Sequence, residues 1–96
     1  MLLEKKVSVP DWLKENDLLS MLLSHAITKY EFFASHASMY SKKYGSDYES
    51  FKRTVEDGQA KEVFERWDDL IEWEAYETAA ADWKARSEEL KACLTL

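Results

Sequence analysis

The scarcity of residues that interrupt helices is the feature that most constrains this chain. It contains one proline, Pro10, and two glycines, Gly45 and Gly58, in 96 residues. Strand-rich and loop-rich folds need more turn residues than this, because Gly and Pro supply the backbone angles of tight turns. The sequence therefore predicts an all-α fold with two long helices, at about 17–44 and 59–92, joined by a short helix at about 47–56.

The first long segment carries apolar residues at the spacing of a coiled-coil seam. Eight of them follow one another at alternating intervals of four and three residues, namely Leu19, Leu23, Ala26, Tyr30, Phe33, Ala37, Tyr40 and Tyr44. This spacing places them on one side of a helix. We expect the seam of the core and of a dimer to be formed by Leu19, Leu23, Tyr30, Phe33 and Tyr40.

Polar residues mark where the helices begin and end. Asn16 or Asp17 is suited to be the N-cap of the first long helix, and Gly45 is suited to follow its last turn. The short helix begins with a predicted capping box in which Ser46 is the N-cap and Glu49 reaches back to it. Its predicted apolar face comprises Tyr48, Phe51 and Val55.

The apolar residues of the last helix change sides along its length. In its first half they are Val63, Phe64, Trp67, Leu70 and Ile71. In its second half they lie on the opposite face and are Tyr76, Ala79, Ala80, Trp83, Leu90 and Leu94, with Trp73 between the two faces. Because no Gly or Pro lies in this segment, we expect a continuous helix that packs one half on its own chain and the other half on a second chain.

The first helix has a second apolar face, formed by Leu18, Met21, Phe32 and Met39. Together the two helices offer more apolar surface than a single hairpin covers, and a large uncovered patch is a liability for a monomer. We therefore expect the helical hairpin to assemble into a dimeric bundle of four to six helices, as a homodimer or a heteromer.

The remaining organisation is simple. Residues 1–10 are predicted to be an N-terminal tail or short strand, and residues 11–96 a single helical domain. The N-terminus lacks signal-peptide features, and no stretch approaches the roughly 20 apolar residues of a membrane span. Cys93 is the only cysteine, so it has no partner for an internal disulfide. We expect a cytoplasmic protein without membrane contact.

The charge is negative and uneven. The net charge is −6, and residues 61–96 hold ten acidic against five basic residues. Such a chain has no overall attraction to nucleic acid or to anionic lipid. The acidic last helix could face a basic protein partner, or it could be a solvated surface that keeps the protein soluble.

Metal chemistry has few candidates. His25 and His36 lie eleven residues apart, about 16 Å along a helix, so they cannot share one ion. The last helix offers carboxylates at a spacing that can hold Mg²⁺, and the candidate ligands are Asp69, Glu72, Glu74 and Glu77. Between Leu18 and Tyr44 the facing helix contributes only Glu31. An alternative function is therefore a small all-α Mg²⁺-dependent nucleotide hydrolase with carboxylates contributed across a dimer; otherwise we expect no catalytic residue, metal or cofactor.

The segment from Lys5 to Leu13, followed by a helix and then a long acidic aromatic helix, resembles small prokaryotic type II antitoxins and antitoxin-like proteins. The resemblance implies an N-terminal segment that pairs two chains and a C-terminal helix that wraps and blocks a basic toxin. The charge-neutral N-terminal third departs from the basic face expected of a DNA-binding antitoxin.

The residues expected to bind a partner combine aromatic anchors with acids. Aromatic side chains contribute much of the binding energy of interfaces, while acids steer a basic partner. The predicted set is Trp67, Trp73, Tyr76, Trp83, Glu72, Glu74 and Glu77. The expected function is thus a non-enzymatic helical protein–protein interaction module of the antitoxin-like inhibitor type.

Overall fold

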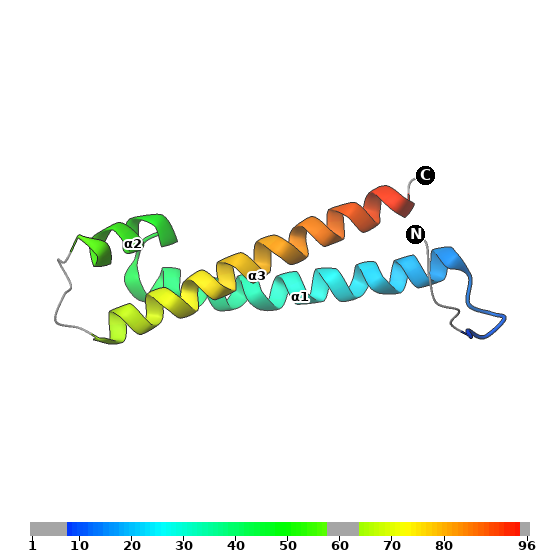
Figure 1. Ribbon diagram of the computed structural model, residues 1–96, viewed down its shortest axis with the longest axis horizontal. Coiled ribbons are helices and arrows are strands. Elements are labelled where there is room, and N and C mark those ends of the chain that lie inside the picture. The colour runs from blue at the N-terminus through cyan, green and yellow to red at the C-terminus, as the bar shows by residue number, and fades with distance from the viewer. Residues whose placement is uncertain (1–7, 58–63, 95–96) are drawn as a thin grey trace.

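The computed structural model describes residues 8–57 and 64–94, and in these residues the regular structure is helical. The helices are α1 (Glu15–Tyr44), α2 (Tyr48–Glu56) and α3 (Phe64–Leu94). Figure 1 shows α1 and α3 running antiparallel along an elongated molecule, with α2 at one end. The molecule measures 60 × 24 × 17 Å. The predicted architecture of two long helices joined by a short one is confirmed.

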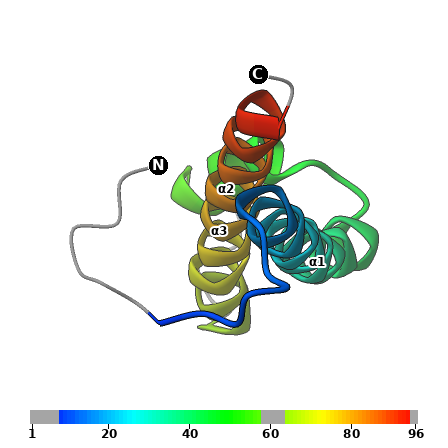
Figure 2. The same cartoon turned by 90° about the vertical axis from the view of Figure 1, so that its right-hand side faces the viewer.

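The two ends of this hairpin differ. We call the end that carries α2 the closed end, formed by residues 37–57 and 64–77. The opposite end, formed by residues 15–30 and 80–94, is the open end. Viewed along the hairpin from the open end, α1 and α3 lie side by side (Figure 2). The predicted tail falls mostly on residues 1–7, which lie outside the described residues, as does the expected start of the last helix at 59–63.

Each end of α1 is capped by residues that lie next to it in the sequence. The N-cap is Lys14, not Asn16 or Asp17, because the Asp17 carboxylate accepts a hydrogen bond from the Lys14 backbone N–H at 3.1 Å and lies inside the first turn. Gly45 ends the helix as predicted, with a left-handed φ of 63° and an N–H that donates to the Ser41 carbonyl at 2.8 Å.

The start of α2 differs from its prediction by one residue. The N-cap is Asp47, whose carboxylate accepts a hydrogen bond from the Ser50 N–H at 2.7 Å. That bond lowers the pKa of Asp47. The hydroxyl of Ser46, the predicted cap, instead donates to the Asp47 carbonyl at 3.2 Å. The predicted apolar face is confirmed, since Phe51 and Val55 are buried.

The last helix is continuous through residues 72–75, as expected. A stripe of its covered residues recurs at intervals of three and four, namely Leu70, Trp73, Tyr76, Ala80, Trp83, Ser87, Leu90 and Leu94, and Arg66, Asp69 and Ala79 are half-buried beside it. Leu70, a member of the predicted first face, packs with Trp73 against α2 of the same chain. Coverage of the rest of that face by a second chain stays a prediction. Trp67 and Ile71 remain 40% and 64% exposed.

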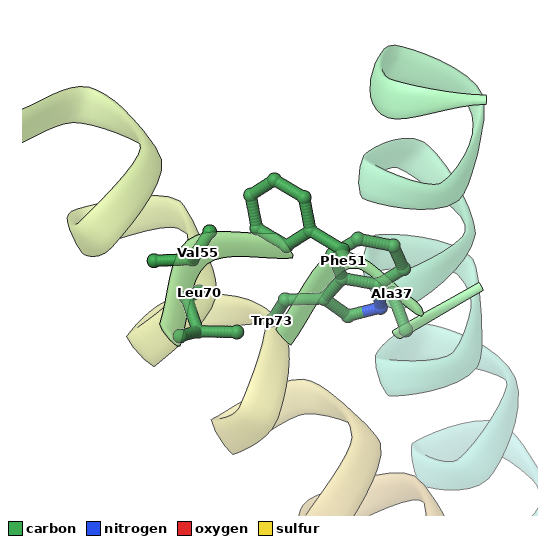
Figure 3. Packing of buried hydrophobic residues seen from close by; sticks show 5 residues of the cluster. All are labelled: Ala37, Phe51, Val55, Leu70 and Trp73. Atoms are coloured by element: carbon green, nitrogen blue, oxygen red, sulfur yellow. The ribbon is translucent and has the colours of Figure 1, made fainter. Parts of the chain in front are cut away.

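The core lies at the closed end, where the three helices meet. Figure 3 shows its buried cluster, which consists of Ala37, Phe51, Val55, Leu70 and Trp73. Val55 is fully buried and Trp73 is 1% exposed. Toward the open end the buried residues of α1 and α3 are Leu19, Ala26, Ala80 and Ser87.

Candidate functional site

Trp73, a predicted partner-binding residue, lies in the core. Its indole ring stacks near Tyr40 and Tyr44, with centroid separations of 5.9 and 6.4 Å. From α2, Phe51 lies 5.4 Å from the same ring. The indole Nε1 donates a hydrogen bond to the Glu77 carboxylate at 3.1 Å. Trp73 and Glu77 are thus paired within the chain, and the indole presents almost no surface to a partner.

Several acids of α3 accept hydrogen bonds from α1. The Tyr40 hydroxyl donates to Glu72, and the Tyr44 hydroxyl donates to Asp69. Lys43 Nζ lies 2.7 Å from Asp69 and 2.9 Å from Glu65. These contacts hold α1 and α3 together at the closed end.

The electrostatics of these pairs follow from the same contacts. The hydrogen bond to Glu72, with burial adding to it, raises the pKa of Tyr40 to about 12. Burial by itself raises the pKa of Asp69, but the hydrogen bonds from Lys43 and Tyr44 outweigh burial, and the pKa is lowered from 3.8. Asp69 is therefore held as a carboxylate, and Tyr40 as a neutral donor.

The candidate metal ligands do not converge in one chain. Asp69 and Glu72 point at donors on α1, and Glu77 accepts from Trp73. Glu74 is exposed on α3. Burial of its hydroxyl raises the pKa of Tyr48, and the charge of Glu74 adds to the rise. Within residues 8–57 and 64–94, no group of three or more His, Cys, Asp or Glu side chains is placed to hold a metal ion.

The predicted core seam lies along α1. Leu19 is buried, and the other four residues are half-buried, namely Leu23, Tyr30, Phe33 and Tyr40. Phe33 lies 6.3 Å from the Tyr76 ring of α3. The remaining predicted aromatic residues, Tyr76 and Trp83, are half-buried on the same interface. They pack within the chain and keep only part of their surface for a partner.

Both histidines pack on these aromatic rings. The His36 ring stacks on Tyr76 with centroids 4.8 Å apart, and the His25 ring meets Trp83 edge-on at 5.4 Å. Arg86 places its guanidinium 4.5 Å from the centre of the Trp83 ring. The histidines thus extend the aromatic surface of the α1–α3 interface toward solvent along one flank.

That flank carries the most prominent uncovered feature of the molecule, which we call the α1 stripe. Its members recur at helical spacing on one side of α1, and they are Leu18, Met21, His25, Phe32, His36 and Met39. Met21, Phe32 and Met39 are 59%, 53% and 63% exposed. The sequence pattern identified the four apolar members. The histidines could have been added from the same spacing.

Two grooves between α1 and α3 border the stripe. One lies at the open end, has a volume of about 510 Å³, and is lined by Leu19, Leu22, His25, Trp83, Arg86, Glu89, Leu90 and Cys93. The other lies at the closed end, has a volume of about 340 Å³, and is lined by His36, Met39, Tyr40, Lys43 and Asp69. The first is largely apolar and the second has charged walls.

A smaller surface on α3 combines the exposed aromatic with acids. Ile71 has Trp67 one turn before it, and Asp68 and Glu74 lie three residues away on either side. All four side chains are exposed. We call this group the Trp67 patch. It retains two residues of the predicted partner-binding set, Trp67 and Glu74, on a surface that is free for binding in the monomer.

Comparison with known proteins gives no family assignment: no family model matches the chain, and no curated protein or solved structure matches it. In the described part of the chain, no helix combines the length and apolar character needed to cross a membrane.

Proposed function

We propose that this protein is a non-enzymatic helical interaction module, and the observation that carries this proposal is the uncovered α1 stripe. Between Leu18 and Ser41, α1 has only two residues with full charges, Lys29 and Glu31. Surface helices of monomers are normally rich in charge on the face away from the core. A long helix with large exposed apolar side chains and few charges is suited to protein contact.

The Trp67 patch supports a second, more specific part of the proposal, which is the capture of a basic protein in the manner of an antitoxin-like inhibitor. An exposed indole supplies an anchor with a large contact area. The flanking carboxylates of Asp68 and Glu74 attract basic side chains and speed association. The proposed compartment is the cytoplasm, which suits the free thiol of Cys93.

Binding between this protein and the purified product of the adjacent reading frame tests the inhibitor proposal. Titration calorimetry should give a complex whose affinity falls with added salt and falls at least tenfold in Trp67→Ala, because an interface anchor is lost. Trp12→Ala is the matched control, since Trp12 is 72% exposed and lies outside the helices. Equal effects of the two substitutions, or no complex at all, would remove the inhibitor proposal.

The alternative proposal, a Mg²⁺-dependent nucleotide hydrolase, requires carboxylates from a second chain. Three of its four candidate ligands in this chain accept hydrogen bonds from Tyr40, Tyr44 or Trp73. No contact of the described residues favours it over the interaction module. Turnover of nucleoside triphosphates that needs Mg²⁺ and disappears in Glu74→Ala would reverse this preference.

A further inference from the structure

We propose that the α1 stripe is covered by a second copy of this chain, with the two α1 helices packed antiparallel across a twofold axis between Thr28 and Lys29. This inference rests on the proposed interaction function and identifies a second copy of the chain as the partner that covers the stripe. It places two α1 helices at the centre of a four-helix bundle, with the two α3 helices outside.

The spacing of the stripe is self-complementary in this arrangement. A twofold contact places the same surface on both copies, so that each residue meets its symmetric counterpart. About the peptide bond between Thr28 and Lys29, Leu18 is symmetric with Met39, Met21 with His36, and His25 with Phe32. Every member of the stripe therefore meets another member of the stripe on the partner.

The charges at the ends of α1 favour the antiparallel direction. The first turn holds Glu15 and Asp17, and the last turn holds Lys42 and Lys43. Antiparallel packing brings the acidic first turn of one copy near Lys42 of the other, whereas parallel packing brings like charges together. Lys43 lies opposite the other copy's Lys14 and is already paired with Asp69 and Glu65 of its own chain, so it adds nothing to this preference. The helix dipoles add to this preference, since opposite ends lie side by side.

The surroundings of the stripe leave room for such a partner. From Leu18 to Met39 the stripe extends about 32 Å at 1.5 Å per residue, which is long enough for a continuous helix–helix contact. No residue of α2 lines either groove beside the stripe. In the dimer, Met39 of each copy lies over the partner's Leu18, next to the apolar groove at the open end, and so covers the part of the hairpin that α2 does not reach.

Mass measurement tests association. Size-exclusion chromatography with light scattering at several protein concentrations should give a dimer. Phe32→Glu should raise the dissociation constant about 30-fold or more, as for a central interface aromatic. Ser24→Glu is the matched control, because Ser24 is exposed on α1 outside the stripe. Circular dichroism of both variants should show unchanged helicity, which separates loss of association from loss of folding.

Cross-linking tests whether the two α1 helices pack antiparallel or parallel. In a Cys93→Ser background, Thr28→Cys should form a disulfide-linked dimer under oxidising conditions, because Thr28 lies next to the axis. Leu18→Cys and Met39→Cys should each fail alone and cross-link when mixed. Self-linkage of Leu18→Cys would show a parallel contact and overturn the proposal.

A wild-type monomer at every concentration would also overturn it. In that case the inhibitor proposal would still stand or fall separately, on the binding of Trp67→Ala to the adjacent gene product.

Discussion

The closed and open ends of the hairpin are built from the same two helices and bury very different side chains. At the closed end three of the five buried residues are large, namely Phe51, Leu70 and Trp73, and they pack with Val55 and Ala37. At the open end three of the four buried residues are small, namely Ala26, Ala80 and Ser87, with Leu19 as the exception. Large residues there stay partly exposed, as Leu22 does at 37%.

The difference shows what a third helix contributes. Two packed helices cover only a narrow stripe on each, so a large side chain on the interface keeps a flank in water. At the closed end, Phe51 and Val55 of α2 cover that flank of Trp73 and Leu70. The polar contacts of Tyr40, Lys43 and Tyr44 with the acids of α3 lie at this end too.

The largest expected effect contrasts one tryptophan from each end. Trp73→Ala should destabilise the protein by about 3–5 kcal/mol, because it leaves a large cavity in the core. Trp83→Ala should cost about 1–2 kcal/mol, since the half-buried ring loses less contact. Urea denaturation in the Phe32→Glu background, which removes the proposed dimer contact, measures both. Equal losses would show that the two ends are packed alike.

The next largest effect concerns how the free energy of unfolding depends on pH in the acid range. Because the pKa of Asp69 is lowered in the folded state, its stabilising contribution is present above the ordinary pKa of 3.8 and is lost as the pH falls through the lowered value. Asp69→Asn should therefore lose about 1–2 kcal/mol at neutral pH and show a weaker acid dependence. Unfolding free energies across the acid range check this. Asp82→Asn, which removes a charge at the exposed open end, is the matched control.

A smaller effect is expected at the turn between α1 and α2. Gly45→Ala should destabilise the protein by about 1 kcal/mol, because a left-handed φ crowds a Cβ against the backbone. The new methyl group would meet no other atom within 4 Å, so the cost is one of backbone strain. A melting temperature equal to that of the wild type would show that the turn relaxes and that α2 does not depend on it.

The smallest effect on stability is expected at the Trp67 patch. Ile71→Ser should change the unfolding free energy by no more than about 0.5 kcal/mol, because the side chain is 64% exposed. Its neighbour Leu70 is 6% exposed, and Leu70→Ala should cost about 2–5 kcal/mol. Denaturant unfolding of the Ile71→Ser and Leu70→Ala variants measures both free energies. A large difference between them would show that the covered stripe of α3 is as narrow at the closed end as its exposure pattern indicates.

Much of the candidate surface could be read from the sequence, because helical spacing places Leu18, Met21, Phe32 and Met39 on one side of α1. The placement of Trp73 could not. It lies between two apolar faces in the sequence pattern, and its surroundings are set by rings from α1 and α2 that are remote in the chain. Periodicity gives the direction of a side chain around its own helix and carries no information on which neighbour lies in that direction.

The sequence by itself determined the three helices and their approximate limits, because the signals are local: few residues interrupt a helix, and Gly45 adopts the left-handed conformation that ends α1. Only the tertiary structure decided which apolar residues of α3 became core. The sequence pattern assigned its two halves to opposite faces, whereas α2 folds back on the closed end and α1 covers one stripe along the rest. Burial depends on the positions of all three helices, and no single segment encodes those positions.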